Sequence, residues 1–204
     1  MFDFLVNRQP KTLNSGLKTW GDLLATLDLD CEADRRTVTE VRFDGVDQPS
    51  YRSLELARRP LSSIAKIEVE LVDRARLLRN TLGTAGNSLP VLAASACRAA
   101  ASFRGHDLAA AHHQLTSLVE AVRTLTILTV ASATAAGTEL EYLPCGADSG
   151  SDVLGSVGVV LDSLAQWQRG SDWTAVADAL EYDLAPALLQ WGVVFDAMQD
   201  RCAA

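Results

Sequence analysis

Apolar residues recur at every third or fourth position in the C-terminal part of the chain. Between Ser171 and Met198 they are Trp173, Val176, Leu180, Leu184, Ala187, Leu188, Trp191, Phe195 and Met198. This spacing predicts one long helix with a broad apolar face. Gly170 can end the preceding element, and Ser171 or Asp172 can cap the new helix. Such a wide apolar face must pack against other helices.

The same period begins at Asp73 and predicts three earlier helices. Their apolar stripes run through residues 78–103, 108–128 and 153–167. Gly83, Gly86 and Pro90 interrupt the first stripe, so a kink or a break is expected near Asn87–Pro90. A loop is expected over 138–151. Four helices joined mostly by short connections indicate an antiparallel four-helix bundle.

The first 72 residues follow a period of two instead. The alternation predicts strands over 2–6, 37–43 and 64–72, with a weaker one near 11–17. Turns are expected at 7–10 and at Asp44-Gly45. A helix capped by Thr19 is expected to end where a polar break over 28–34 begins, and a second short helix is expected over 50–58. Because each element has one apolar face to bury, the economical arrangement is one helix across a small mixed sheet.

The chain is therefore expected to be an α+β protein with two domains. Residues 1–72 resemble a β-grasp, or ubiquitin-like, arrangement in their order of elements, and residues 73–204 form the helical bundle. Carrier proteins of the β-grasp type act through a free C-terminal Gly-Gly. Here the last strand runs into Asp73 with no Gly-Gly after it, so a carrier role is not expected.

Charge and composition restrict the classes of partner. The formal net charge is -8, and from Leu108 onward three arginines stand against twelve acidic residues. Such a surface repels phosphate backbones, so no nucleic-acid partner is expected, whereas a basic partner would be attracted. The plainer alternative is that these carboxylates keep a helical bundle soluble.

The expected location is the cytoplasm. No apolar run reaches the roughly 20 residues that a membrane-spanning helix needs, and no signal peptide is apparent, so no membrane partner is expected. The four cysteines lack paired spacing and are expected to be reduced thiols. They are Cys31, Cys97, Cys145 and Cys202.

The sequence offers little chemistry. No glutamate is followed three residues later by a histidine, as a di-iron bundle would require, and no phosphate-binding loop, dinucleotide fingerprint or nucleophile elbow occurs. His106, His112 and His113 are expected to lie at the surface or at helix caps. We therefore expect no catalytic residue, no cofactor and no metal, although a triad assembled from distant residues is not excluded.

The most prominent polar cluster lies on the last predicted helix. Asp178, Glu181 and Tyr182, together with Trp191, are the candidate partner-binding residues. The carboxylates could attract a basic partner, and the aromatic rings could anchor it. The alternatives are that the carboxylates form a solvated flank, and that Trp191 fills the core.

Four segments together resemble a group of uncharacterised bacterial proteins in which a β-rich head precedes a helical bundle. They are TWGDLL, VTEVRFDG, IEVEL and DWTAVADALEYDLAPALLQW. That group carries no known activity. The acidic bundle is also similar in pattern to flagellar export chaperones, which wrap a helix of a partner protein, but no diagnostic motif or site residue comes with this similarity.

Three functions are compatible with these patterns. The leading hypothesis is a non-enzymatic adaptor or chaperone-like protein that binds a partner protein through the bundle. The second is a structural homodimer. The third is a small-molecule binder or enzyme with a site at the junction of the two domains.

Overall fold

The computed structural model describes residues 3–12 and 16–203 of an α+β protein. The chain divides into two compact units, Met1–Leu77 and Leu78–Ala204, which we call the sheet unit and the helical unit. The division falls inside one helix, five residues after the boundary expected from the sequence at residue 72. Each unit has a separate hydrophobic core.

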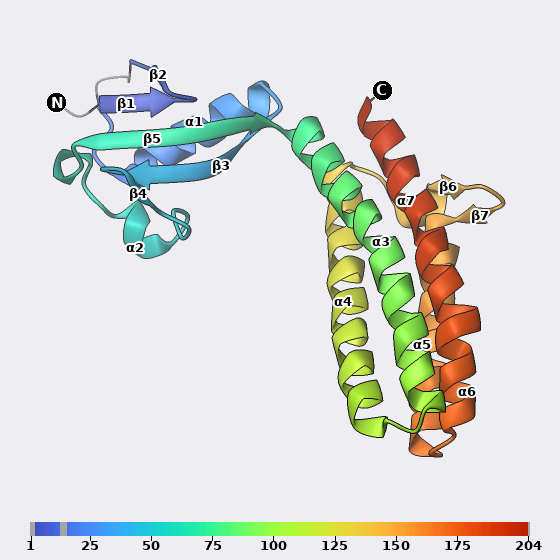
Figure 1. The fold of residues 1–204 in the computed structure, drawn as a ribbon. Coiled ribbons are helices and arrows are strands. Elements are labelled where there is room, and N and C mark those ends of the chain that lie inside the picture. Colours follow the sequence, from blue (N-terminus) through green and yellow to red (C-terminus); the bar gives the residue numbers. More distant parts are fainter. Residues whose placement is uncertain (1–2, 13–15, 204) are drawn as a thin grey trace. The chain divides into compact units, whose positions relative to one another are not determined.

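The sheet unit is a small mixed sheet with one long helix (Figure 1). The strand order is β2-β1-β5-β3-β4; β1 and β5 are parallel, and the other neighbours are antiparallel. Its elements are β1 (Asp3–Val6), β2 (Gln9–Pro10), α1 (Trp20–Ala33), β3 (Arg36–Phe43), β4 (Val46–Asp47), α2 (Leu54–Ala57), η1 (Leu61–Ser63) and β5 (Lys66–Asp73).

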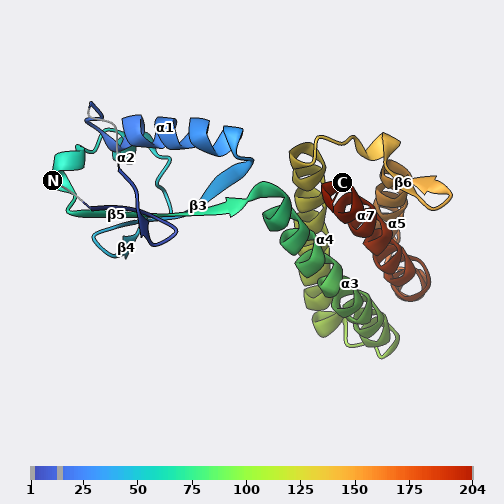
Figure 2. The same cartoon turned by 90° about the horizontal axis from the view of Figure 1, so that it is seen from above.

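Helix α1 covers one face of this sheet (Figure 2). A capping box begins it: the Thr19 hydroxyl accepts from the Asp22 N–H, and the Asp22 carboxylate accepts from the Thr19 N–H. The helix buries Trp20, Leu23, Leu24, Leu27 and Cys31. These side chains meet the inward residues of the strands, so the core lies between α1 and the sheet. They include Phe4, Val38, Val41, Phe43, Ile67 and Val69.

The structure corrects the bounds of three local expectations for this unit. The expected turn at 7–10 is a hairpin whose corner residues, Asn7 and Arg8, have φ of 51° and 65°, and β2 starts directly after it. Helix α1 continues through the expected polar break as far as Ala33. Of the expected short helix over 50–58, only Leu54–Ala57 is helical.

Two expectations lie partly outside the described residues, and one further expectation is confirmed. Residues 13–15 of the weak strand expected near 11–17 lie outside the described residues, as does residue 2 of the first strand. The turn at Asp44-Gly45 is confirmed, with φ of 53° and 81°.

The helical unit contains helices that share one hydrophobic core (Figure 1). They are α3 (Arg74–Arg104), α4 (Leu108–Ala135), α5 (Gly150–Arg169), α6 (Trp173–Asp178) and α7 (Ala185–Ala203), with the π-helix η3 (Ala179–Leu184) joining the last two. Between α4 and α5 lie η2 (Leu140–Tyr142) and a hairpin of β6 (Pro144–Cys145) and β7 (Asp148–Ser149), where the sequence predicted a loop.

Proline is accommodated in two ways in these helices. Pro90 lies inside α3, which is continuously helical from Arg74 to Arg104, so the break expected near this proline does not occur. Pro186 instead follows the π-helix. A proline cannot donate a backbone hydrogen bond, and its ring crowds the preceding turn. The Ala185 N–H donates to the Leu180 carbonyl, an i→i+5 bond that widens the helix directly before Pro186.

Helix α4 is the one helix among the described residues that is long and apolar enough to cross a membrane by length and composition. One third of its most apolar window (33%) is buried. A single stripe accounts for that burial and faces the core, and Glu120 and Arg123 interrupt the opposite face. The stripe consists of Ala111, Leu115, Leu118, Val122, Leu125, Thr129, Ser132 and Ala133. This amphipathic distribution is typical of a helix that packs one face against a core.

Candidate protein-interaction site

The carboxylates predicted to bind a partner are held by an arginine from another helix. Arg104, the last residue of α3, donates to Asp178 at 2.8 Å and also to Glu181. Its guanidinium lies 5.7 Å from the centre of the Tyr182 ring, within cation–π range. The hydrogen bonds to Asp178 and Glu181 raise the pKa of Arg104 above its ordinary value. The predicted carboxylates are therefore already paired with an arginine, and they link the end of α3 to α6 and to the π-helix η3.

The other two predicted residues have opposite environments. Tyr182 is 65% exposed, so its ring is accessible at the surface. Trp191 is 1% exposed, and its indole N–H donates to the Thr129 hydroxyl at 3.2 Å. Trp191 therefore belongs to the core. This agrees with the alternative that it fills the core, and not with the hypothesis that it anchors a partner. Of the four candidates, Tyr182 is therefore the one that offers a large exposed ring, although Arg104 contacts part of it.

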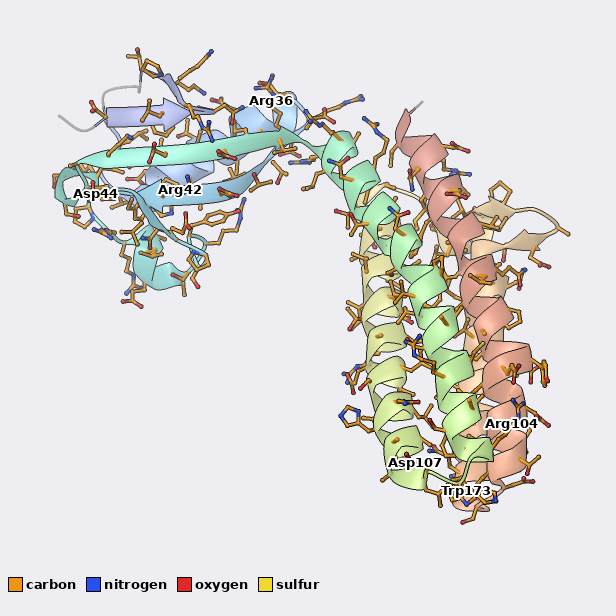
Figure 3. The ribbon with its side chains drawn as sticks, viewed as in Figure 1. Arg36, Arg42, Asp44, Arg104, Asp107 and Trp173 are labelled. Atoms are coloured by element: carbon orange, nitrogen blue, oxygen red, sulfur yellow. The ribbon has the colours of Figure 1, made fainter. Side chains whose placement is uncertain are left out.

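Three rings pack together at the same end of the helical unit as Arg104 (Figure 3). Phe103 of α3 stacks on Trp173 of α6, with centroids 5.6 Å apart, and His112 of α4 meets both rings edge-on. His112 therefore packs between helices instead of lying free at the surface. Among the described residues, no group of three His, Cys, Asp or Glu side chains could hold a metal ion.

A shallow groove runs between α5 and the segment formed by η3 and α7. It encloses about 420 Å³. On the α5 side lie Ser156, Val159, Val160, Ser163 and Trp167; on the other side lie Tyr182, Asp183, Pro186, Ala187 and Gln190. We call this surface the α5/α7 groove.

The α5/α7 groove exposes apolar side chains that a folded domain normally buries or scatters. Val159 is 67% exposed and Tyr182 is 65% exposed. On the outer face of α7, Leu189 and Val193 are 52% and 42% exposed. They follow Pro186 at intervals of three and four residues, so the apolar surface extends along α7 beyond the groove. Exposed apolar side chains that gather at a groove are typical of interaction sites.

The π-helix helps to present this surface. An i→i+5 turn accommodates more residues than an α-helical turn. Leu180 and Leu184 remain fully buried on the core side of η3, while both Tyr182 and Asp183 face outward. The widened turn thus places two adjacent side chains at the α5/α7 groove without disturbing the core register on either side.

A second surface, on α3 and α4, carries no charge. Residues 80–97 of α3 and 124–138, at the end of α4, contain no Asp, Glu, Lys or Arg. A hollow of about 400 Å³ lies between these helices, lined by Asn80, Thr81, Thr84, Ala85, Ser88, Leu125 and Leu128. Ile127 is 62% exposed on the outer side of α4. We call this the α3/α4 face.

The sheet unit has a cavity of about 410 Å³ beside the β1–β2 hairpin and the end of α1. Lys11 and Asp30 form a 2.9 Å ion pair at its edge, and Cys31 lies at its wall. Burial, with a smaller contribution from nearby aspartates, raises the pKa of the Cys31 thiol, so this cysteine is a poor nucleophile at neutral pH. Cys31 is therefore not an activated nucleophile in this cavity.

The sequence reasoning missed most of the α5/α7 groove. Of the residues that line it, only Tyr182 was among the candidate partner-binding residues. Arg104 was missed entirely because it lies 74 residues from Asp178 in the chain. The signal that could have pointed to the groove was Pro186 inside the predicted last helix.

No protein family, curated protein or solved structure matches the chain.

Proposed function

We propose that this protein is a non-enzymatic adaptor or chaperone-like protein that binds another protein through the α5/α7 groove. The observation that carries the proposal is the exposure of Val159 and Tyr182 beside Trp167 in a groove between two helices. A groove of this form suits an amphipathic helix of a partner, which places its apolar face between two supporting helices. Exposed aromatic side chains are frequent anchors of such contacts.

The proposal extends to the architecture and location. We propose that the sheet unit is β-grasp-like, supported by the strand order β2-β1-β5-β3-β4 and by α1 across one face. The helical unit is proposed to be an antiparallel four-helix bundle in which α6, η3 and α7 together act as the fourth helix. The location is proposed to be cytoplasmic, in a bacterial protein of the uncharacterised group that the sequence resembles.

Site-specific photo-crosslinking in the native host tests the partner proposal. A photoreactive residue replaces Val159 in the groove or, as a matched control, Val46 of β4 in the sheet unit, which is similarly exposed at 62%. The expected result is one protein adduct at position 159 and none at position 46. Equal labelling at both positions, or no adduct at either, would contradict the proposal.

A homodimer is the second candidate function, and the α3/α4 face favours it. Two copies of an acidic protein repel each other except where charges are absent, and this face provides such a region. Sedimentation equilibrium should then give a dimer that Ile127→Glu dissociates and Val159→Glu leaves intact. A monomer across the micromolar range would remove this candidate.

A further inference from the structure

The charges around the α5/α7 groove indicate what kind of helix would occupy it; this inference rests on the proposed function above. Between Gly150 and Ala203 the chain has eight carboxylates and two arginines, with no lysine. The carboxylates belong to Asp152, Asp162, Asp172, Asp178, Glu181, Asp183, Asp196 and Asp200. With Arg104 of α3, which pairs with Asp178 and Glu181, eight carboxylates stand against three arginines, so the surface that a groove-bound helix would meet carries a net negative charge.

Half of these carboxylates are already engaged within the protein. Asp178 and Glu181 bind Arg104, and Asp152 and Asp172 accept backbone or hydroxyl hydrogen bonds at the starts of α5 and α6. Within the described part of the chain, no hydrogen bond or ion pair involves the side chains of the other four. An external cation can therefore pair with them without breaking an internal contact.

The free carboxylates lie beside the apolar positions. Asp183 itself lines the α5/α7 groove, next to Tyr182. Asp162 is three residues after Val159 on α5, and Asp196 is three residues after Val193 on α7. Residues three apart are neighbours on a helix surface. An apolar strip is thus flanked by carboxylates along both supporting helices.

We propose that the occupant of the α5/α7 groove is a cationic amphipathic helix of a partner protein. Its apolar stripe would contact Val159, Trp167, Tyr182 and Pro186, and its lysines or arginines would pair with Asp162, Asp183 and Asp196. A neutral or acidic helix would leave those carboxylates facing apolar or like-charged groups, which costs affinity. A second copy of this chain is also disfavoured here, because its helical unit carries the same excess of carboxylates.

Three synthetic peptides of about 18 residues, long enough for five turns, provide the test. One has leucines at i, i+4, i+7 and i+11 and lysines on the flanks; the second replaces lysine by glutamate; the third keeps the lysine peptide's composition but scatters the leucines. Binding to the full-length chain is followed by fluorescence anisotropy at physiological salt. The amphipathic lysine peptide should bind at least about ten-fold more tightly than either control peptide.

Matched variants locate the contact. Val159→Ser should weaken the lysine peptide about four-fold through lost apolar contact, and Asp183→Asn about three-fold, with a reduced dependence on salt. Val91→Ser and Glu120→Gln, on α3 and α4, should leave its affinity unchanged. All four positions are exposed, so none of these substitutions should impair folding.

The outcomes separate the two proposals. If the lysine peptide and its scattered-leucine form bind with equal affinity, charge alone accounts for binding. That result would overturn the inference. If a native partner crosslinks at position 159 but the lysine peptide binds no better than the glutamate peptide, the adaptor proposal stands and the cationic helix is wrong. If neither crosslinking nor peptide binding occurs, both proposals fail.

Discussion

At the scale of single residues, two tryptophans show how each core combines burial with a satisfied polar atom. Trp20 is fully buried between α1 and the sheet and donates its indole N–H to the Tyr51 carbonyl at 2.7 Å. Trp191 does the same in the helical unit through Thr129. A buried indole without a partner would carry a desolvation cost of roughly 1–3 kcal/mol. Within the described residues, no buried side-chain nitrogen or oxygen lacks a partner.

Replacement of Trp191 tests its place in the core. Trp191→Ala should lower the free energy of unfolding of the helical unit by about 3–5 kcal/mol, because it removes a large buried ring and leaves a cavity. Trp191→Phe keeps most of the volume and should cost less. Urea unfolding followed by circular dichroism at the helix band measures both. Val193→Ala, two residues away and partly exposed, serves as the control and should change little.

The buried thiol of Cys31 should make the stability of the sheet unit depend on pH. Burial raises its pKa in the folded state, so the unfolded chain releases this proton at a lower pH than the folded chain. The corresponding stability is complete below about pH 8.5, the ordinary thiol pKa, and is lost as the pH rises above it. Urea unfolding of the sheet unit under reducing conditions should show this loss.

Cys31→Ala is the control for that dependence. The variant starts from a different stability at neutral pH, but it should lose less stability between neutral pH and pH 10 than the natural chain. The two proteins differ only at this side chain, so the difference between their pH curves isolates the thiol. Parallel pH curves for the two proteins would contradict the assigned effect of burial.

At the scale of elements, sequence periodicity identified the segments that have one clear apolar face. Strands β3 and β5 and the long helices lie where the pattern placed them. The end of α1 was misjudged because Asp28, Asp30, Glu32 and Asp34 resemble a polar break. In the structure Leu27 and Cys31 are buried on the core side of α1. The acidic side chains between them lie on the other side, where they pair with a lysine and an arginine.

Other features that the sequence did not fully predict share a different cause: the deciding contact lies elsewhere in the chain. The corner at Asn7 and Arg8 lacks the glycine that usually marks a tight hairpin, and the pairing of β1 with β5 holds it. Asn7 also exchanges side-chain hydrogen bonds with the backbone of Leu71, 64 residues away. The α5/α7 groove likewise exists because two helices lie side by side, which no single helix pattern reveals.

The π-helix makes a prediction about deletions. An i→i+5 turn holds about one residue more than an α-turn, so removal of the exposed residue Asp183 should convert η3 to an α-helix and preserve the core register. Removal of Gly192 from α7 should instead rotate the following residues by about 100°, taking Val194, Phe195 and Met198 out of the core. Thermal unfolding should show a modest loss for the first deletion and loss of cooperative folding for the second. Similar losses would mean that η3 does not absorb an extra residue.

At the scale of the whole molecule, the two units differ in charge as well as in fold. Residues 1–77 contain twelve lysines and arginines against thirteen acidic residues, and residues 78–204 contain six against thirteen. The negative charge of the chain therefore resides almost entirely in the helical unit. That distribution places electrostatic attraction of a basic partner on the same unit that carries the α5/α7 groove.

Separate cores predict that local damage in one unit leaves the other intact. Matched helix starts allow a direct comparison, since Thr19 with Asp22 and Ser149 with Asp152 form the same capping box, one in each unit. Thr19→Ala should lower the stability of the sheet unit by about 1 kcal/mol, and Ser149→Ala should do the same to the helical unit. Hydrogen exchange resolved by segment should show faster exchange in α1 and β3 for the first variant, and in α5 and α7 for the second. Faster exchange across both units in either variant would mean that α3, which crosses the boundary at Leu77, couples them into one cooperative structure.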